Sequence, residues 1–120
     1  MDAPSTENER EEVMIVTLKR KTGEYLTIKQ FPLNKKIFVS SCGKVFITYD
    51  NKRFTERTYF VTNNRYVSVT CNCKYGKNMF VHRLVLMTWC RMPYSGEEAA
   101  HVDSNTFNNA ISNLIWCSHS

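Results

Sequence analysis

Short hydrophobic runs, separated by residues that favour turns, extend over residues 13–81 of the chain. β-branched and aromatic residues are frequent in these runs, which is typical of strands in an antiparallel sheet. Gly, Asn and Asp at the breaks fit tight turns between neighbouring strands. The pattern predicts strands at residues 14–19, 25–29, 37–40, 45–49, 58–62, 66–74 and 79–81.

The period of the hydrophobic pattern changes at His82. Apolar residues from Leu84 to Trp89 recur at the spacing of one helical face, and Pro93 follows shortly after. Because proline cannot continue a helix, the pattern predicts one helix over residues 82–90. We expect this helix to pack on the sheet with its apolar face.

The remaining residues predict a second, smaller set of elements. We expect a strand at 99–102, a turn that begins with Asp103, Ser104 and Asn105, a short helix at 108–113 and a strand at 114–117. The expected fold class is α+β, in which an antiparallel sheet and one packed helix are followed by this carboxy-terminal region.

The chain has 120 residues and a mass of 14.0 kDa, which suits one domain. Residues 1–12 are acidic and lack apolar periodicity, so we expect a disordered tail there. Residues 13–120 should form a single domain, with a β-rich part at 13–81 and the helix with the carboxy-terminal region at 82–120. No apolar run approaches the roughly 18 residues of a membrane span, and no signal-peptide pattern is found, so we expect a soluble, intracellular protein.

The net charge of +5 conceals an uneven distribution. Residues 1–12 hold five of the 11 acidic residues and one of the 16 basic ones, so the rest of the chain carries +9. A basic surface attracts nucleic acid, because binding to phosphates releases condensed counterions. Any single lysine here is more often part of a solvated strand face, but the set as a whole favours nucleic acid. The candidate phosphate-binding residues are Lys74, Lys77, Arg83 and Arg91.

Five cysteines are present, an odd number that argues against a disulfide framework. Cys71 and Cys73 form the one close pair, and on a strand they would share a face with two valines. Free cysteine behaves there as a small hydrophobe, so core packing is the preferred role. The alternative is a structural Zn²⁺ site that draws on Cys71, Cys73, Cys90, Cys117 or His119.

His101 stands in a segment rich in carboxylate and amide side chains. A neutral imidazole can take a proton from water near neutral pH, which makes His101 a candidate general base. Asp103 lies two residues on, on the same face of the expected strand, where it could orient the ring or cap the turn. A histidine that is bonded to a backbone carbonyl, without a catalytic role, is the commoner case.

The spacing around His101 is that of His-x-Asp-x-Asn, then Asn108-Asn109, then Asn113-Leu-x-Trp. It resembles the HNH endonucleases of the phage and intron-homing type, whose members share a ββα-metal (His-Me) finger. Two upstream segments, at 80–85 and 39–45, are similar to the helix start and the strand-turn-strand module that precede the finger in this group. Together the resemblance covers roughly residues 37–117.

The resemblance implies a role for each residue of the segment. His101 would deprotonate the attacking water, and Asn113 would brace the finger loop and help to hold the histidine. The finger turn would be formed by Asp103, Asn105, Asn108 and Asn109, the last two at the start of the short helix. The implied cofactor is Mg²⁺ or another divalent ion, and the implied partner is DNA.

Two positions depart from the family pattern. The residue before the histidine, which is usually Asp or Asn and often a metal ligand, is Ala100. The helix that carries the last ligand is expected to be missing, because the sequence stops at Ser120, and His119 is a weak substitute. We therefore expect an HNH-like finger that lacks its last helix, in a metal-dependent DNA endonuclease or nickase. The alternatives are a degenerate module that binds DNA or another partner without cleaving it, and a zinc-stabilised interaction module.

Overall fold

The structure is a computed structural model and describes residues 13–118. The acidic segment 1–12, expected to be a disordered tail, and His119, the weak candidate ligand, lie outside the described residues. The strands are β1 (Ile15–Lys19), β2 (Tyr25–Gln30), β3 (Ile37–Ser40), β4 (Val45–Ile47), β5 (Thr55–Glu56), β6 (Phe60–Thr62), β7 (Tyr66–Cys73), β8 (Gly76–Phe80), β9 (Glu97–His101) and β10 (Leu114–Ser118). The helices are α2 (Val81–Trp89) and the 3₁₀ helix η1 (Ile111–Asn113).

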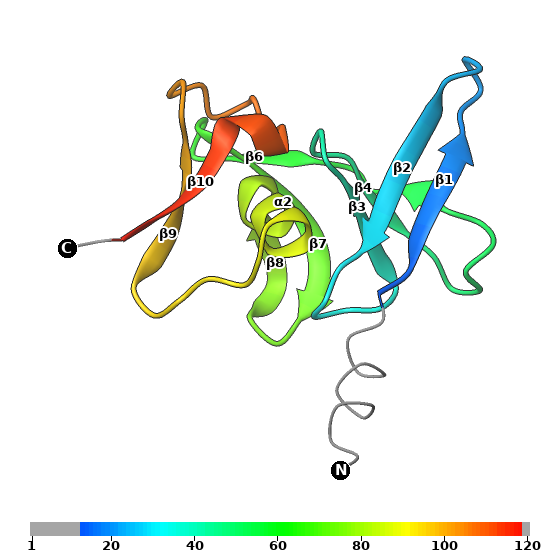
Figure 1. Cartoon of the computed structure of the whole chain (residues 1–120), viewed down its shortest axis with the longest axis horizontal. Helices are drawn as coiled ribbons and strands as arrows, with labels where there is room; N and C mark the ends of the chain where they lie inside the picture. Colours follow the sequence, from blue (N-terminus) through cyan, green and yellow to red (C-terminus); the bar gives the residue numbers. More distant parts are fainter. Residues whose placement is uncertain (1–12, 119–120) are drawn as a thin grey trace, which may run out of the picture.

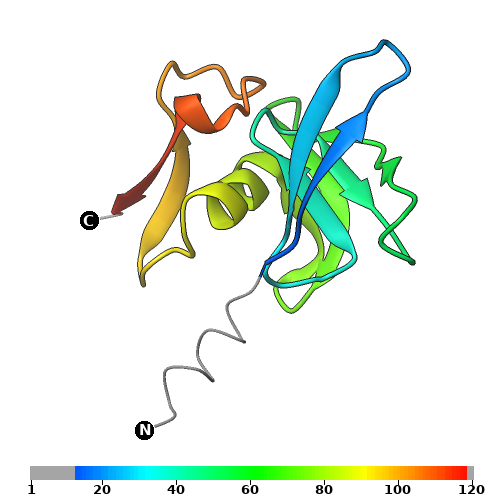
Figure 2. The same cartoon turned by 45° about the vertical axis from the view of Figure 1, so that its right-hand side comes forward.

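The strands form three antiparallel sheets. The first has the order β1-β2-β3-β4-β5, the second β6-β7-β8, and the third pairs β9 with β10. Figures 1 and 2 show α2 between the β9–β10 pair on one side and the two larger sheets on the other. The α+β fold class with one packed helix is thus confirmed, whereas the expectation that residues 13–81 form one sheet is wrong.

The division into two sheets occurs between β5 and β6. Tyr59 lies in this connection, and its hydroxyl donates to Glu56 Oε2 at 2.6 Å and accepts from the Val45 amide at 3.0 Å. These bonds hold the connection against the edge of the first sheet, so the following strand pairs with β7 instead of continuing the first sheet. Strand β5, two residues long, was not expected from the pattern.

The strand β3 separates two hydrophobic clusters, which explains why all four of its residues are buried. Phe38 packs with Ile28 and Phe46 on one face. Ile37 and Val39 face a larger cluster on the other side, because successive side chains of a strand point to opposite faces. The larger cluster contains residues of β7, the apolar face of α2 and Leu114 of β10.

Two tryptophans fix α2 relative to its neighbours. The Trp89 indole donates to the Val39 carbonyl at 2.9 Å, and the Trp116 indole donates to the Arg91 carbonyl at 2.9 Å. The first bond connects the helix to β3, and the second connects β10 to the segment after the helix. None of the helices within residues 13–118 is long and apolar enough to cross a membrane.

Replacing Thr88 with valine is expected to stabilise the protein. Thr88 is 5% exposed on α2, and its hydroxyl oxygen has no hydrogen-bond partner among the described residues. Burial of an unpaired hydroxyl costs about 1–3 kcal/mol, and valine has nearly the same shape. Urea unfolding should therefore give a higher midpoint for T88V with an unchanged slope, and a lower midpoint would contradict the burial of an unpaired oxygen.

Candidate active site

His101 is the last residue of β9 and is half-buried, opposite Leu114 of β10. Its Nε2 lies 2.8 Å from Oδ1 of Asn109, a buried residue in the loop that joins the two strands. An amide oxygen accepts hydrogen bonds, so Nε2 carries the hydrogen and Nδ1 keeps its lone pair. This arrangement suits proton abstraction by Nδ1.

The loop after His101 is held by a set of side-chain bonds centred on Asp103 and Asn113. The Asn113 amide donates to Asp103 Oδ1 at 2.8 Å and to the Asn108 carbonyl at 2.9 Å, and it accepts from the Asp103 amide at 3.1 Å. Asp103 also accepts from the Asn105 amide at 2.8 Å and from the Asn108 side chain at 3.1 Å. The hydrogen bonds, first that of Asn105, lower the pKa of the Asp103 carboxyl.

These bonds show that the residue that caps the turn, the residue that braces the loop and the residue that contacts His101 are three different residues. Asp103 caps the turn, and its carboxylate accepts hydrogen bonds from the asparagines and not from the imidazole. Asn113 braces the loop, but the side chain bonded to His101 is Asn109. The short helix predicted at 108–113 is a 3₁₀ helix over Ile111–Asn113 only, because residues 108–110 belong to the loop before it.

The strand-turn-strand segment upstream packs directly on this loop. The Ile111 amide donates to the Ser41 carbonyl at 2.7 Å. Gly43 has φ +98°, and a Cβ placed on it would lie 3.0 Å from Asn109 Cβ and 3.2 Å from the Asn109 carbonyl oxygen. Glycine at this turn therefore permits the approach that places Asn109 beside His101.

Rings from the second sheet and from α2 surround His101. The His82 ring centroid is 4.5 Å from that of His101, with planes 34° apart. Tyr66 lies 5.5 Å from His82 and 6.4 Å from His101, and Phe80 contacts both Tyr66 and His82. Burial, and then the charges of His101 and Arg83, lower the pKa of His82 to about 4.

Sequence reasoning missed His82 and the specific role of Asn109. His82 was interpreted as part of a helix start, and no local spacing connects residues 82 and 101. The sequence feature that could have indicated His82 is the direct succession of β8 and α2. It puts residue 82 in the first turn of a helix that contacts β7 and β9.

The described residues do not form a metal-binding cluster. Within residues 13–118, no group of three or more His, Cys, Asp or Glu side chains is placed to hold an ion. Ala100 presents a methyl group at the expected ligand position. The Sγ atoms of Cys71 and Cys73 are 3.7 Å apart within the large core cluster, as expected for packing, and burial raises the pKa of Cys71 to about 12.

The four candidate phosphate-binding residues have different surroundings. Lys74 and Lys77 are exposed at the β7–β8 hairpin, and Lys74 lies 5.4 Å from the Tyr75 ring centroid. Arg83 is half-buried near Tyr75 and Trp116. Arg91 is engaged in the fold instead, because its guanidinium donates to both Glu97 carboxylate oxygens at 2.7 and 3.0 Å.

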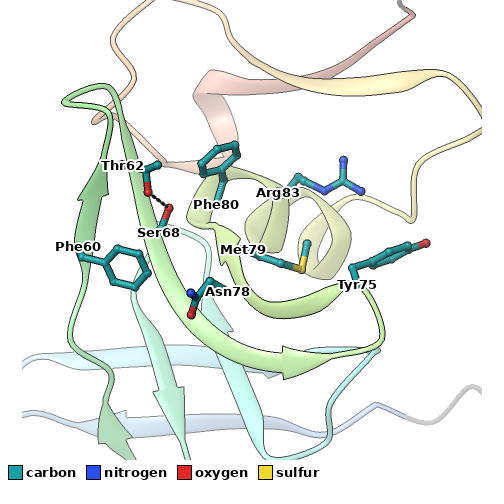
Figure 3. Close-up of a pocket in the computed structure, with 8 residues that line it drawn as sticks. All are labelled: Phe60, Thr62, Ser68, Tyr75, Asn78, Met79, Phe80 and Arg83. Atoms are coloured by element: carbon teal, nitrogen blue, oxygen red, sulfur yellow. Dashed lines mark hydrogen bonds between the residues drawn. The ribbon is translucent and has the colours of Figure 1, made fainter.

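A groove lies on the second sheet next to these rings (Figure 3). It has a volume of about 530 Å³ and contains aromatic, amide and hydroxyl side chains. A second cavity, of about 360 Å³, adjoins it and shares Phe80 and Arg83 with it. The second cavity is also lined by His82, so the groove continues to the residues that surround His101. The groove is lined by Phe60, Thr62, Ser68, Tyr75, Asn78, Met79, Phe80 and Arg83.

Comparison with known proteins gives two matches and no matching family model. An uncharacterized HNH endonuclease of Acanthamoeba polyphaga mimivirus is 33% identical over 86 residues, which cover 70% of this chain and 25% of that protein. A solved structure on DNA binding and cleavage by the HNH homing endonuclease I-HmuI matches with a TM-score of 0.63 and 25% identity. That match covers 76% of this chain and 52% of the neighbour, so the chain spans about a quarter and a half of the two proteins.

The two matches are independent in kind, since one rests on sequence and the other on the arrangement of the backbone. Both lead to the same group of proteins. On this evidence the chain belongs to the HNH endonuclease family.

Proposed function

We propose that this chain hydrolyses phosphodiester bonds in DNA as an HNH-type endonuclease or nickase, with His101 as the general base. The observation that carries the proposal is the bond between His101 Nε2 and Asn109 Oδ1 at 2.8 Å. It assigns the ring hydrogen to Nε2 and leaves Nδ1 to accept a proton. His101 is half-buried at the end of a strand, where a substrate can reach it.

The proton transfer proceeds in one step with the attack. The oxygen of a water molecule bonds to phosphorus while its proton passes to Nδ1 of His101, and the bond from phosphorus to the leaving oxygen breaks. The leaving oxygen takes a proton from the solvent. Asn109 stabilises the imidazolium that results, because its amide oxygen continues to accept the Nε2 hydrogen. Asn113 acts indirectly, by bracing the loop that carries Asn109.

A divalent ion, Mg²⁺ in our proposal, would stabilise the charge that develops on the phosphate and the leaving oxygen. The residues described here do not fit such an ion well. Ala100 offers no donor atom, and no ligand cluster is present within residues 13–118.

Ala100 also supports a second candidate function. A finger that keeps His101 and its loop but lacks metal ligands could bind DNA without cleaving it. The basic residues at the β7–β8 hairpin and Arg83, beside the aromatic groove, support DNA as the partner in either case (Figure 3). We also propose an intracellular location, where a DNA-binding protein meets its substrate.

A nicking assay separates the two functions. Purified protein is incubated with supercoiled plasmid in Mg²⁺ or Mn²⁺, with EDTA as the control. Conversion to open circles that EDTA abolishes supports the nuclease. Binding without conversion, with an affinity that falls steeply as salt rises, supports the second function.

Replacing Gly43 with alanine is expected to lower both stability and nicking. The added Cβ would approach Asn109 to 3.0 Å at a backbone φ of +98°, and a left-handed conformation costs a non-glycine residue about 1–3 kcal/mol. Displacement of Asn109 would then release the His101 ring. Urea unfolding and the nicking rate measure the two effects.

Gly23→Ala is the matched control for Gly43→Ala. Gly23 has a similar φ of +94°, but an added Cβ meets nothing within 4 Å. G23A should therefore lose stability without losing catalytic rate. Equal nicking rates for the two variants would show that the contact with Asn109 does not matter.

A further inference from the structure

We propose that His82 is a positioning residue, whose ring holds the His101 imidazole in the orientation that Asn109 selects. This inference rests on the proposed function, because it concerns the general base of that reaction. It adds a residue that lies 19 positions away in the sequence and on a different element.

The geometry places His82 against the face of the His101 ring. The centroids are 4.5 Å apart, which is the near end of the range for contact between aromatic rings. Asn109 restrains the same imidazole at its edge, through Nε2. A bond at the edge leaves rotation about that bond free, whereas a ring against the face restricts it. The two contacts together define the direction of Nδ1.

His82 is itself held firmly. It is 5% exposed in the first turn of α2, which begins directly at the end of β8. Tyr66 stacks on it at 5.5 Å with planes 16° apart, and Phe80 lies at 5.6 Å. His82 and Ala99 also line the adjoining cavity together. Ala99 and His101 share a face of β9, so His82 lies beside the strand that carries His101.

The charge of His82 is suited to this position. Its pKa of about 4 leaves the ring neutral at pH 7, so His82 does not repel the proton that His101 receives. The other ionisable groups around the adjoining cavity are Tyr66 of β7, Arg83 of α2 and Glu98 of β9. A neutral aromatic ring can therefore replace His82 in a test without changing the charge of the site.

The test compares His82→Ala with His82→Phe, using Thr88→Val as a control on the same helix. Under saturating plasmid, H82A should lower kcat by about a hundredfold with little change in KM, because the base is misplaced but DNA contacts remain. H82F keeps a ring against His101 and should recover most of kcat. T88V changes a buried residue of α2 outside the site and should keep the rate of the unchanged protein.

A second readout does not need cleavage. The Nε2–H resonance of His101, slowed in exchange by the bond to Asn109, is expected in the NMR spectra of the unchanged protein and of H82F. This resonance should broaden or vanish in H82A. Its absence from the spectrum of the His101→Ala variant assigns the resonance to His101. If the unchanged protein does not nick DNA, the proposed function fails, and this resonance still tests the role of His82.

Three results would overturn the inference: kcat of H82A within about twofold of the unchanged protein, H82F no better than H82A, or an unaltered Nε2–H resonance in H82A. A fall in kcat of T88V as large as that of H82A would also overturn it, because a general disturbance of α2 would then explain the loss.

Discussion

Replacing His101 with alanine is expected to reduce plasmid nicking by a factor of about 10²–10⁴, the usual contribution of a positioned general base. The loss should appear in kcat, because Nδ1 of His101 takes the proton of the attacking water in the proposed reaction. DNA affinity, measured by fluorescence anisotropy, should remain nearly unchanged, since the candidate phosphate-binding residues Lys74, Lys77 and Arg83 are kept. Nicking by H101A at the rate of the unchanged protein would refute the nuclease assignment.

His101→Gln is the matched control for this variant. A glutamine amide can donate to Asn109 Oδ1 as Nε2–H of His101 does, but it cannot accept a proton near neutral pH. H101Q should therefore keep the loop intact and be as inactive as H101A. If H101Q were active, the part of His101 in the reaction would be structural.

Replacing Asn113 with alanine is expected to destabilise the protein by about 2–4 kcal/mol, because three hydrogen bonds are lost and their partners are left in a partly buried loop. Asn113 is 8% exposed and connects Asp103 and the Asn108 carbonyl at 2.8–3.1 Å. Urea unfolding measures the loss. The nicking rate should also decrease at urea concentrations at which the variant is still folded, since the same loop carries Asn109.

Asn105→Ala provides the comparison for Asn113→Ala. Asn105 is an exposed residue of the same loop, and its side-chain oxygen accepts one bond, from the Phe107 amide at 3.0 Å. We expect about 1 kcal/mol or less for N105A. A loss for N113A no larger than that for N105A would show that the network around Asp103 does not hold the loop.

The results of these variants also bear on Ala100. If the chain nicks DNA with a divalent ion and H101A does not, the ion must be held without a side-chain ligand at position 100. If neither protein nicks but both bind DNA, the finger serves as a binding module.

The local elements could be predicted because their signals lie within a few residues. The hairpin of β1 and β2, the long strand β7, the helix α2 and the β9–β10 pair all agree with the predicted positions to within a few residues. Turn residues and periodicity are local properties, so a single sequence suffices for them. The separation of the two sheets was not predictable in this way, because it depends on the contact of Tyr59 with Glu56 and Val45.

The candidate site could likewise be predicted only in part from the sequence. The sequence by itself determined the α+β class and the excess of basic residues after residue 12, and it made His101 and, through the family resemblance, Asn113 candidate site residues. The tertiary structure decided which side chains touch His101. Asn109 reaches His101 because Gly43 lets the upstream turn approach, and His82 reaches it because α2 packs between β7 and β9.

The tertiary structure also decided the surroundings of Arg91, a candidate phosphate-binding residue that forms an ion pair with Glu97. These contacts join residues that are far apart or on different elements, and they form when the apolar faces of α2 and the sheets are buried together. Burial of those faces is a property of the whole chain, and no local pattern around His101 contains it.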